Sequence, residues 1–309
     1  MIALYSDPKV CHDAMVRFRW PDGVECPHCG STTVWFTEKR LRWQCKDCGK
    51  QFTVKVGTIF EDSALPLGKW LPAVWLIANC KNGISSCELA RSIGVTQKTA
   101  WFMLHRIRTA MAEGTFEKMD GTVEADETFI GGLEKNKHND KKLRQGRGSV
   151  GKTIVMGVLQ RSDTESEVSR VLANIIPNVS GNTLRAEITK AVEKFTRVYT
   201  DAWKGYNGLS TEYLHQFIDH TIAYAIGQVH TNGLENFWSL LKRALKGTYV
   251  SVEPFHLKRY IDEQVFRFNN RGETDAERFV EVLESVDGKR LTYDELTESY
   301  KEYYDAIFP

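Results

Sequence analysis

Three acidic residues, Asp126, Asp201 and Glu235, stand in sequence contexts typical of a strand, a strand end and a helix. The last two are 34 positions apart, and Lys242 follows Glu235 by seven residues. Carboxylates brought together from separate elements form an oxygen-lined pocket that suits Mg²⁺ or Mn²⁺. The pattern therefore predicts metal-assisted phosphoryl transfer, with these acids holding two ions about 4 Å apart.

Each acid also has an ordinary structural interpretation. Asp126 fits a solvated strand face, and Asp201 fits the N-cap of the turn that carries Trp203. Asn232 and Glu235 fit a capping pair at the start of a helix. The joint occurrence of the three acids with a following lysine favours the metal site over three separate structural roles.

The elements that must position these acids follow from hydrophobic periodicity. Strands are predicted over 122–130, 152–160, 168–176 and 197–201, and less firmly over 216–218. One helix is predicted from Ser180 to about Lys194, and another from near Thr231. Three strands, a helix and a fourth strand make the chain order of an α/β RNase H-like domain, placed at 120–250.

The second helix separates into two faces at about 100° per residue. Its predicted core face contains Leu234, Phe237, Trp238, Leu241 and Leu245. The opposite face presents Glu235, Lys242 and Lys246, with Asn232 beside them. A carboxylate beside lysines suits a phosphodiester substrate, because the lysines neutralise flanking phosphates.

The amino-terminal region, 1–62, contains two C-x₂-C pairs separated by 15 residues. This spacing predicts one structural Zn²⁺ on four thiolates, with no open catalytic position. A glycine follows each pair, as a turn with positive φ requires. A redox role is disfavoured because the pairs lie outside a βαβ pattern. The predicted ligands are Cys26, Cys29, Cys45 and Cys48.

Residues 63–115 have the pattern of an all-α helix-turn-helix, with Gly94 at the turn and Thr96 as N-cap of the second helix. The start of a recognition helix meets base edges, which places Gln97 and Lys98 against DNA. The alternative is a helical hairpin that binds no DNA. The predicted DNA-contact residues of the whole chain are Gln97, Lys98, Arg106, Lys242, Arg243 and Lys246.

Charge is distributed unevenly along the 309 residues, despite a net charge of only +1. Residues 1–250 carry 33 Lys and Arg against 26 Asp and Glu, whereas 251–309 carry 8 against 14. A basic body suits a DNA-binding protein, and the acidic, helical 251–309 extension is expected to pack on its own chain or on a partner subunit, the alternative being a solvated tail. A basic loop at 133–151 fits either DNA contact or a solvated loop.

The sequence shows neither a membrane span nor a signal peptide. No apolar run approaches the roughly 20 residues of a membrane span, and the charged first 20 residues do not fit a signal peptide. Seven cysteines, an odd number, favour reduced thiols. A cytoplasmic, nucleoid-associated protein is expected.

These motifs together resemble the DDE transposases of bacterial and archaeal insertion sequences, in the zinc-ribbon-bearing group related to the Merlin superfamily. The resemblance rests on blocks throughout the chain: 19–23, 51–53, 57–60, 126–132, 230–238, 242–243 and 267–271. It implies binding to terminal inverted repeats and target double-stranded DNA, 3′-end cleavage and strand transfer in a dimer or larger assembly. Because some members use Asn as the third ligand, Asn232 is the alternative to Glu235.

Two other functions fit part of the pattern. A transposase-derived regulator would bind DNA without cutting it, although the intact acids argue against such decay. A nuclease of the RNase H type would cut without strand transfer, but it has no evident need for two DNA-binding modules.

Overall fold

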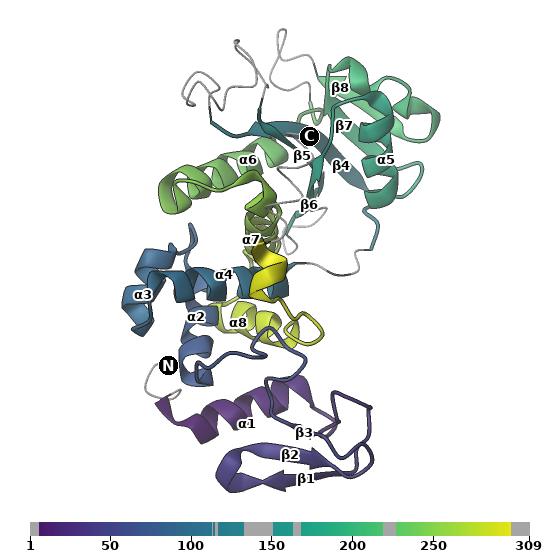
Figure 1. The fold of residues 1–309 in the computed structure, drawn as a ribbon. Coiled ribbons are helices and arrows are strands. Elements are labelled where there is room, and N and C mark those ends of the chain that lie inside the picture. Colours follow the sequence, from purple (N-terminus) through teal and green to yellow (C-terminus); the bar gives the residue numbers. More distant parts are fainter. Residues whose placement is uncertain are drawn as a thin grey trace. The chain divides into compact units, whose positions relative to one another are not determined.

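The computed structural model describes residues 6–112, 114, 117–132, 151–162, 168–218 and 227–297. The chain divides into two compact units (Figure 1). One contains residues up to Ala112 together with those from Glu273 onward, and the other contains Glu113–Gly272. The second unit is therefore inserted in the sequence of the first.

The first unit begins with a zinc-ribbon module. Its strands are β1 (Val34–Thr37), β2 (Arg42–Cys45) and β3 (Gln51–Phe52), which form an antiparallel sheet in that order, and its helix is α1 (Pro8–Arg19). The inner face of the sheet is aromatic. Trp43 stacks on Phe52 and on His12 of α1, with ring centroids 5.6 and 4.9 Å apart. This stack joins the helix to the ribbon.

Three helices follow: α2 (Leu67–Asn79), α3 (Ser86–Ile93) and α4 (Gln97–Met111). The predicted turn is confirmed, because Gly94 has φ of 65° and the Thr96 side chain accepts a hydrogen bond from Thr99 N. Leu89, Ala100, Leu104 and Ile107 are buried as predicted, whereas Ile93 and Val95 are partly exposed.

The carboxyl-terminal part of this unit packs on its amino-terminal part. Helix α8 (Asp275–Glu284) lies against α2, where the rings of Trp75 and Phe279 meet with centroids 5.5 Å apart. Arg278 Nε also donates to Asn79 Oδ1 at 3.0 Å. The segment predicted as a single extension, 251–309, is therefore divided between the two units.

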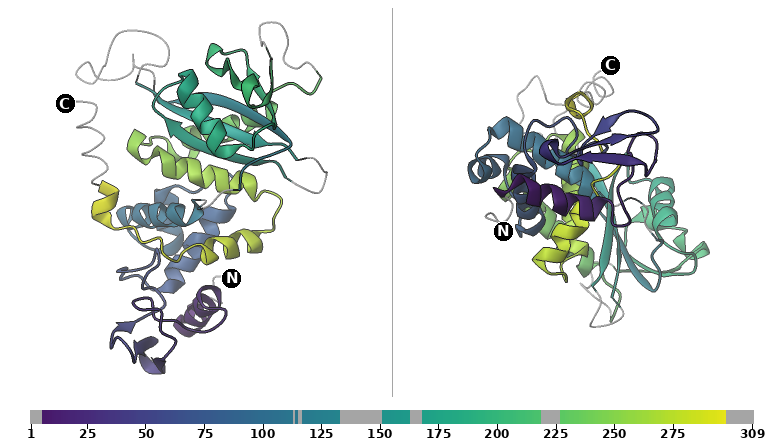
Figure 2. Two further views of the ribbon diagram at one scale, coloured as in Figure 1. Left: turned by 90° about the vertical axis from the view of Figure 1, so that its right-hand side faces the viewer. Right: turned by 90° about the horizontal axis from the view of Figure 1, so that it is seen from below.

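A five-stranded sheet forms the centre of the second unit (Figures 1 and 2). Its strands are β4 (Thr122–Ile130), β5 (Thr153–Gln160), β6 (Arg170–Ile176), β7 (Arg197–Asp201) and β8 (Leu214–Ile218), in the order β6-β5-β4-β7-β8. Strand β5 is antiparallel to both neighbours, while β4, β7 and β8 run parallel. All five predicted strands are present.

Helices cover both faces of this sheet. Helix α5 (Gly181–Ala191) buries Leu184 and Ile188 against one face. Helices α6 (Asn232–Ala244) and α7 (Leu257–Asn269) pack on the other, and a π-helical turn, Leu245–Tyr249, follows α6. Asn269 of α7 binds strand β6 through its side-chain amide. Its Oδ1 accepts from Val171 N, and its Nδ2 donates to Val171 O.

The core face predicted for α6 is confirmed. All five of its predicted members are buried, namely Leu234, Phe237, Trp238, Leu241 and Leu245. Among the described residues, no helix is both long and apolar enough to span a membrane.

Candidate functional site

Asp126 lies in β4, opposite Gly157 of β5, at the point where α6 crosses the sheet. Its Oδ2 accepts a hydrogen bond of 2.9 Å from Trp238 Nε1 of α6. Burial raises the pKa of Asp126 to about 7, against that hydrogen bond and with the nearby charges of Glu127 and Asp201 adding to the increase. A cation beside a buried carboxylate would stabilise its ionised form.

Asp201 ends β7, the parallel neighbour of β4, so its side chain lies near that of Asp126. Its Oδ1 accepts the backbone N–H of Trp203 at 3.0 Å. The turn-capping role considered for Asp201 is thus present, and it occupies one of the two carboxylate oxygens. This contact orients the side chain without excluding a metal from the other oxygen.

Glu127 is an acidic neighbour that the sequence did not single out. Its Oε2 accepts a 2.6 Å hydrogen bond from the buried hydroxyl of Tyr206. Burial raises the pKa of Glu127, opposed by the Tyr206 hydrogen bond and reinforced by the charge of Asp201. Its position directly after Asp126 was the available signal.

Two glycines let α6 approach the sheet closely. A Cβ atom on Gly157 would lie 2.7 Å from the Trp238 ring, and one on Gly233 would lie 2.9 Å from a carboxylate oxygen of Glu124. Both distances are shorter than carbon atoms tolerate without displacing their neighbours. Small residues at these positions therefore determine where α6, and with it Glu235, sits above β4.

Glu124 caps α6 from the neighbouring strand. The fully buried carboxylate accepts the backbone N–H of Leu234 at 3.0 Å, so it satisfies a donor that the first turn of a helix leaves open. Thr231, and not Asn232, is the N-cap residue, and its side chain makes no capping hydrogen bond. The capping pair considered for Asn232 and Glu235 is thus wrong, since a carboxylate distant in sequence takes that role.

Arg161 completes this attachment. Its Nε donates to Glu124 Oε1 at 2.7 Å, and its other nitrogens reach Gln228 O and His230 O just before α6. Burial, followed by the charge of Arg161, lowers the pKa of His230. The strand that carries Asp126 and the helix that carries Glu235 are thus joined by charged and hydrogen-bonded contacts as well as by packing.

The outer face of α6 carries the remaining predicted groups. Glu235 and Asn232 are exposed, and Lys242 is partly buried. Burial lowers the pKa of Lys242, while the charge of Asp126 opposes that decrease. Lys242 therefore lies close to Asp126, as a cation that neutralises a phosphate at this site would need to.

The acids do not form a closed cluster. Within the described part of the chain, the one set of three or more Cys, His, Asp or Glu ligand atoms mutually within 4.8 Å is made of cysteines. The ligand atoms of Asp126, Asp201 and Glu235 are thus not all within 4.8 Å of one another. Oxygen donors of this kind are the ligands that hard divalent cations prefer. Burial, reinforced by the charges of Glu127 and Asp201, raises the pKa of Asp126, so a divalent cation bound beside it would favour its ionised form.

The cysteine cluster is the zinc site that the spacing predicted. The Sγ atoms of Cys26 and Cys48 are 3.7 Å apart, and those of Cys29 and Cys45 are 3.6 Å apart. A tetrahedron with Zn–S bonds of about 2.3 Å has edges of about 3.8 Å. The N–H of Cys48 donates to Cys45 Sγ and is the largest of the causes that lower the pKa of that thiol to about 6, whereas the pKa of Cys29 is raised.

Comparison with known proteins identifies the domains that carry these residues. Residues 118–269 match the ISXO2-like transposase domain, and residues 6–51 match a transposase zinc-ribbon domain. A transposase-like protein of Haemophilus influenzae is 33% identical over 102 residues, which are 33% of this chain and 82% of that protein. The chain belongs to the ISXO2-like transposase family.

A second relative extends the similarity along most of this transposase. It is a protein in the transposable element ISH50 of Halobacterium salinarum, 28% identical over 258 residues, or 79% of this chain and 85% of the relative. The family match identifies the chain as a DDE transposase, an enzyme of DNA transposition whose catalysis depends on divalent metal. The four cysteines of its ribbon are a structural zinc site.

The predicted DNA-contact residues of the transposase fall into different environments. Gln97 and Lys98 are exposed at the start of α4, where Gln97 Nε2 donates to Ser86 Oγ and Lys98 lies over the ring of Tyr293. Arg243 and Lys246 are exposed at the end of α6 and in the π-helical turn. The basic loop, apart from residue 151, lies outside the described residues.

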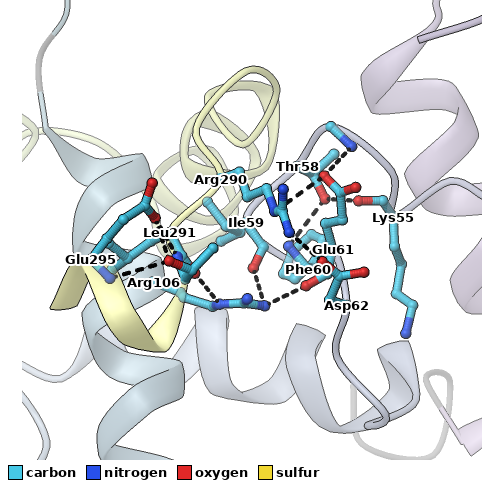
Figure 3. Close-up of polar contacts among 12 residues, drawn as sticks. Lys55, Thr58, Ile59, Phe60, Glu61, Asp62, Arg106, Arg290, Leu291 and Glu295 are labelled. Carbon is cyan, nitrogen blue, oxygen red and sulfur yellow. Dashed lines mark hydrogen bonds and ion pairs between the residues drawn. The ribbon is translucent and has the colours of Figure 1, made fainter. Parts of the chain in front are cut away.

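Arg106 does not have the surroundings of a DNA contact (Figure 3). Its side chain is buried, and its guanidinium donates to the backbone oxygens of Ile59, Glu61 and Leu291 at 2.7–3.0 Å. These carbonyl groups come from the ribbon linker and the carboxyl-terminal segment. The prediction that Arg106 contacts DNA is therefore wrong. Its buried side chain joins α4 to the ribbon linker and to the carboxyl-terminal segment.

Proposed function

We propose that this transposase binds the terminal inverted repeats of its element, cuts their 3′ ends, and joins those ends to target DNA. The observation that carries the proposal is the hydrogen bond between Asp126 and Trp238. It ties the first acid to the helix that presents Glu235 and Lys242. A single carboxylate would have an ordinary structural role, but an acid held against the helix that carries Glu235 and Lys242 supports a shared site.

Asp126, Asp201 and Glu235 would hold two Mg²⁺ or Mn²⁺ ions. These ions supply Lewis-acid stabilisation of charge on the phosphate oxygens and lower the pKa of bound water. Glu235 is preferred to Asn232 as the third ligand, since hard cations favour carboxylate oxygens. Lys242, beside Asp126, would neutralise the phosphate that flanks the scissile bond.

Two displacements at phosphorus complete the reaction. In the first, water attacks the phosphodiester, the P–O3′ bond breaks, and the element end is left with a 3′-hydroxyl. In the second, that hydroxyl loses its proton and attacks a target phosphodiester, whose own P–O3′ bond breaks. Because two element ends must be joined, we propose a dimer or larger assembly.

The proposed catalytic unit is RNase H-like. Its strands follow the order 3-2-1-4-5, with the second antiparallel to the rest, and its acids lie on the first strand, the fourth strand and a later helix. Recognition of the repeats is assigned to Gln97 and Lys98. A Lys98→Ala variant should bind the element end more weakly with a smaller salt dependence, and an unchanged affinity would count against this assignment.

Cleavage of the DNA that flanks the gene tests the proposal. Wild-type protein with Mg²⁺ should nick at the repeat boundaries, and Asp126→Asn should bind the same DNA without cutting it. Glu235→Gln should be inactive and Asn232→Ala active if Glu235 is the third ligand. Tight binding by the wild type without cleavage in Mg²⁺ or Mn²⁺ would instead indicate a DNA-binding regulator.

A further inference from the structure

The outer face of the ribbon sheet carries an exposed tryptophan that neither metal site uses. Trp35 of β1 is 65% exposed. The opposite face of the sheet is filled by Trp43 and Phe52, which are buried against α1. Trp35 thus has no role in the ribbon core, and leaving so large an apolar ring in water is unfavourable.

The strand register places polar side chains beside this ring. Trp35 pairs with Gln44, which pairs with Gln51, so the three residues form a row across β1, β2 and β3. Arg42 lies on the same face and donates to Gln51 Oε1 at 2.9 Å, which orients its guanidinium. With strands about 4.8 Å apart, the row is about 10 Å wide.

Charge beside this row favours a polyanion as the occupant. Between Cys26 and Phe52 the chain has five exposed cations, Lys39, Arg40, Arg42, Lys46 and Lys50, against two acids. Glu38 pairs with Lys9, whereas Asp47 keeps its charge while accepting from Ser31. Zn²⁺ with four thiolates adds a charge of about −2, so the excess of cations over the module is small. The row of Trp35, Gln44 and Gln51 itself contains no acid and has Arg42 beside it, which favours a phosphate there.

We propose that this face, formed by Trp35, Thr37, Arg42, Gln44 and Gln51, binds the sugar-phosphate backbone of duplex DNA. Trp35 packs on deoxyribose, the glutamine amides donate to backbone oxygens, and Arg42 pairs with a phosphate. Such contacts position a protein without reading its sequence. The face therefore adds affinity for any duplex, and the inference rests on the proposed binding of DNA by this transposase.

The test compares two duplexes of equal length, one from the flank of the gene and one unrelated. Binding of full-length, zinc-loaded protein is measured by fluorescence anisotropy over a salt series, without Mg²⁺. Trp35→Ala should weaken both complexes by a similar factor of about ten, which leaves their affinity ratio unchanged. Arg42→Gln should reduce the slope of log K against log salt by about 1 on both duplexes.

Two further variants keep the result interpretable. Phe195→Ala removes another exposed ring, 76% exposed in the other unit, and should leave both affinities unchanged. Zinc content per chain reports whether each ribbon variant is folded. If Trp35→Ala loses zinc, Gln44→Glu decides instead, because it keeps the shape of the face and adds a repelling charge that should weaken both complexes.

Equal affinities and salt slopes for wild type and the face variants would overturn the inference. So would unchanged DNA binding with a change in oligomeric mass, which would make this face a contact between copies of the chain. A protein that binds through this face but never cuts would refute the proposed catalysis alone. A protein that cuts normally and binds normally without Trp35 would refute this inference alone.

Discussion

The zinc site and the proposed catalytic site of this transposase differ in how closely the folded chain brings their ligands together. The zinc ligands come from two tight turns between Cys26 and Cys48, and their sulfur atoms already have nearly the spacing of a tetrahedral site. The proposed catalytic acids come from β4, β7 and α6, and their ligand atoms do not all lie within 4.8 Å of one another. Local chain geometry is enough for the first site, whereas the second depends on tertiary packing.

Charge explains much of this difference. A thiol has an ordinary pKa near 8.5, so thiols can approach one another with less repulsion than carboxylates. The backbone N–H of Cys48 is the largest cause that lowers the pKa of Cys45 to about 6. Carboxylates are ionised at neutral pH, and bringing three together without a cation is costly. Asp126 shows this cost directly, because burial and its acidic neighbours raise its pKa to about 7. We therefore expect metal ions to complete the proposed catalytic site.

Of the changes considered, removing zinc should have the largest effect on folding. Cys45→Ser should abolish zinc binding and unfold the ribbon, because zinc binding to such modules contributes on the order of 10 kcal/mol. Zinc content and circular dichroism measure the change. Cys87→Ser, at an exposed cysteine outside the cluster, should retain one zinc per chain. A folded ribbon in Cys45→Ser would show that the aromatic stack on α1 suffices without metal.

The pH dependence of stability should reveal the raised pKa of the buried Asp126 carboxyl group. Because the folded-state pKa of Asp126 is raised from 3.8 to about 7, its contribution to stability is present below pH 3.8 and is lost as pH rises through 7. The loss approaches about 4 kcal/mol, at about 1.4 kcal/mol per pKa unit. Thermal unfolding of zinc-loaded, Mg²⁺-free wild type should therefore depend more steeply on pH than that of Asp126→Asn.

Adding Mg²⁺ sharpens that measurement. The ion should stabilise the wild type at pH 8, where Asp126 is ionised, and much less at pH 5, where the carboxyl group is protonated. Asp126→Asn should show little stabilisation at either pH. Identical pH profiles for wild type and variant, with or without Mg²⁺, would contradict the burial of an ionisable Asp126.

The position of α6 on the sheet should be sensitive to a single methyl group added at Gly233. Gly233→Ala places a Cβ atom 2.9 Å from the carboxylate of Glu124, which must move or displace the helix. A loss of about 1–3 kcal/mol in unfolding free energy is expected, with a larger loss in cleavage than in DNA affinity. Gly247→Ala is the matched control, because nothing lies within 4 Å of its added Cβ. Equal behaviour of the two variants would exclude Glu124 as a rigid cap.

The smallest effect is expected from the Trp238 hydrogen bond. Trp238→Phe keeps an aromatic ring in the core but removes the donor to Asp126 Oδ2, at a cost of about 1 kcal/mol. Since that hydrogen bond lowers the pKa of Asp126, the variant should raise it further and move the pH midpoint of Mg²⁺ stabilisation upward. Trp75→Phe, in the other unit, should not move the midpoint. An unchanged midpoint in Trp238→Phe would remove Trp238 from the site.

Local sequence patterns were sufficient to predict most of the helices and strands. Cysteine spacing, strand alternation and the helical period of Leu234, Phe237 and Trp238 predicted the elements correctly, because each depends on neighbouring residues alone. Contacts between distant elements were not predictable. Glu124 caps α6 across 110 positions of sequence, and Arg106 had the appearance of a surface cation until the carboxyl-terminal segment covered it. Charge alone does not reveal which polar residues become buried.

The most direct test of this account is an anomalous-scattering map of crystals of the transposase soaked with Mn²⁺. The zinc peak at the four cysteines serves as an internal standard for an assembled site. We expect manganese peaks between Asp126 and Asp201, with Glu235 drawn toward them as the third ligand. A strong zinc peak with no manganese density at Asp126 and Asp201 would contradict the catalytic assignment of these acids.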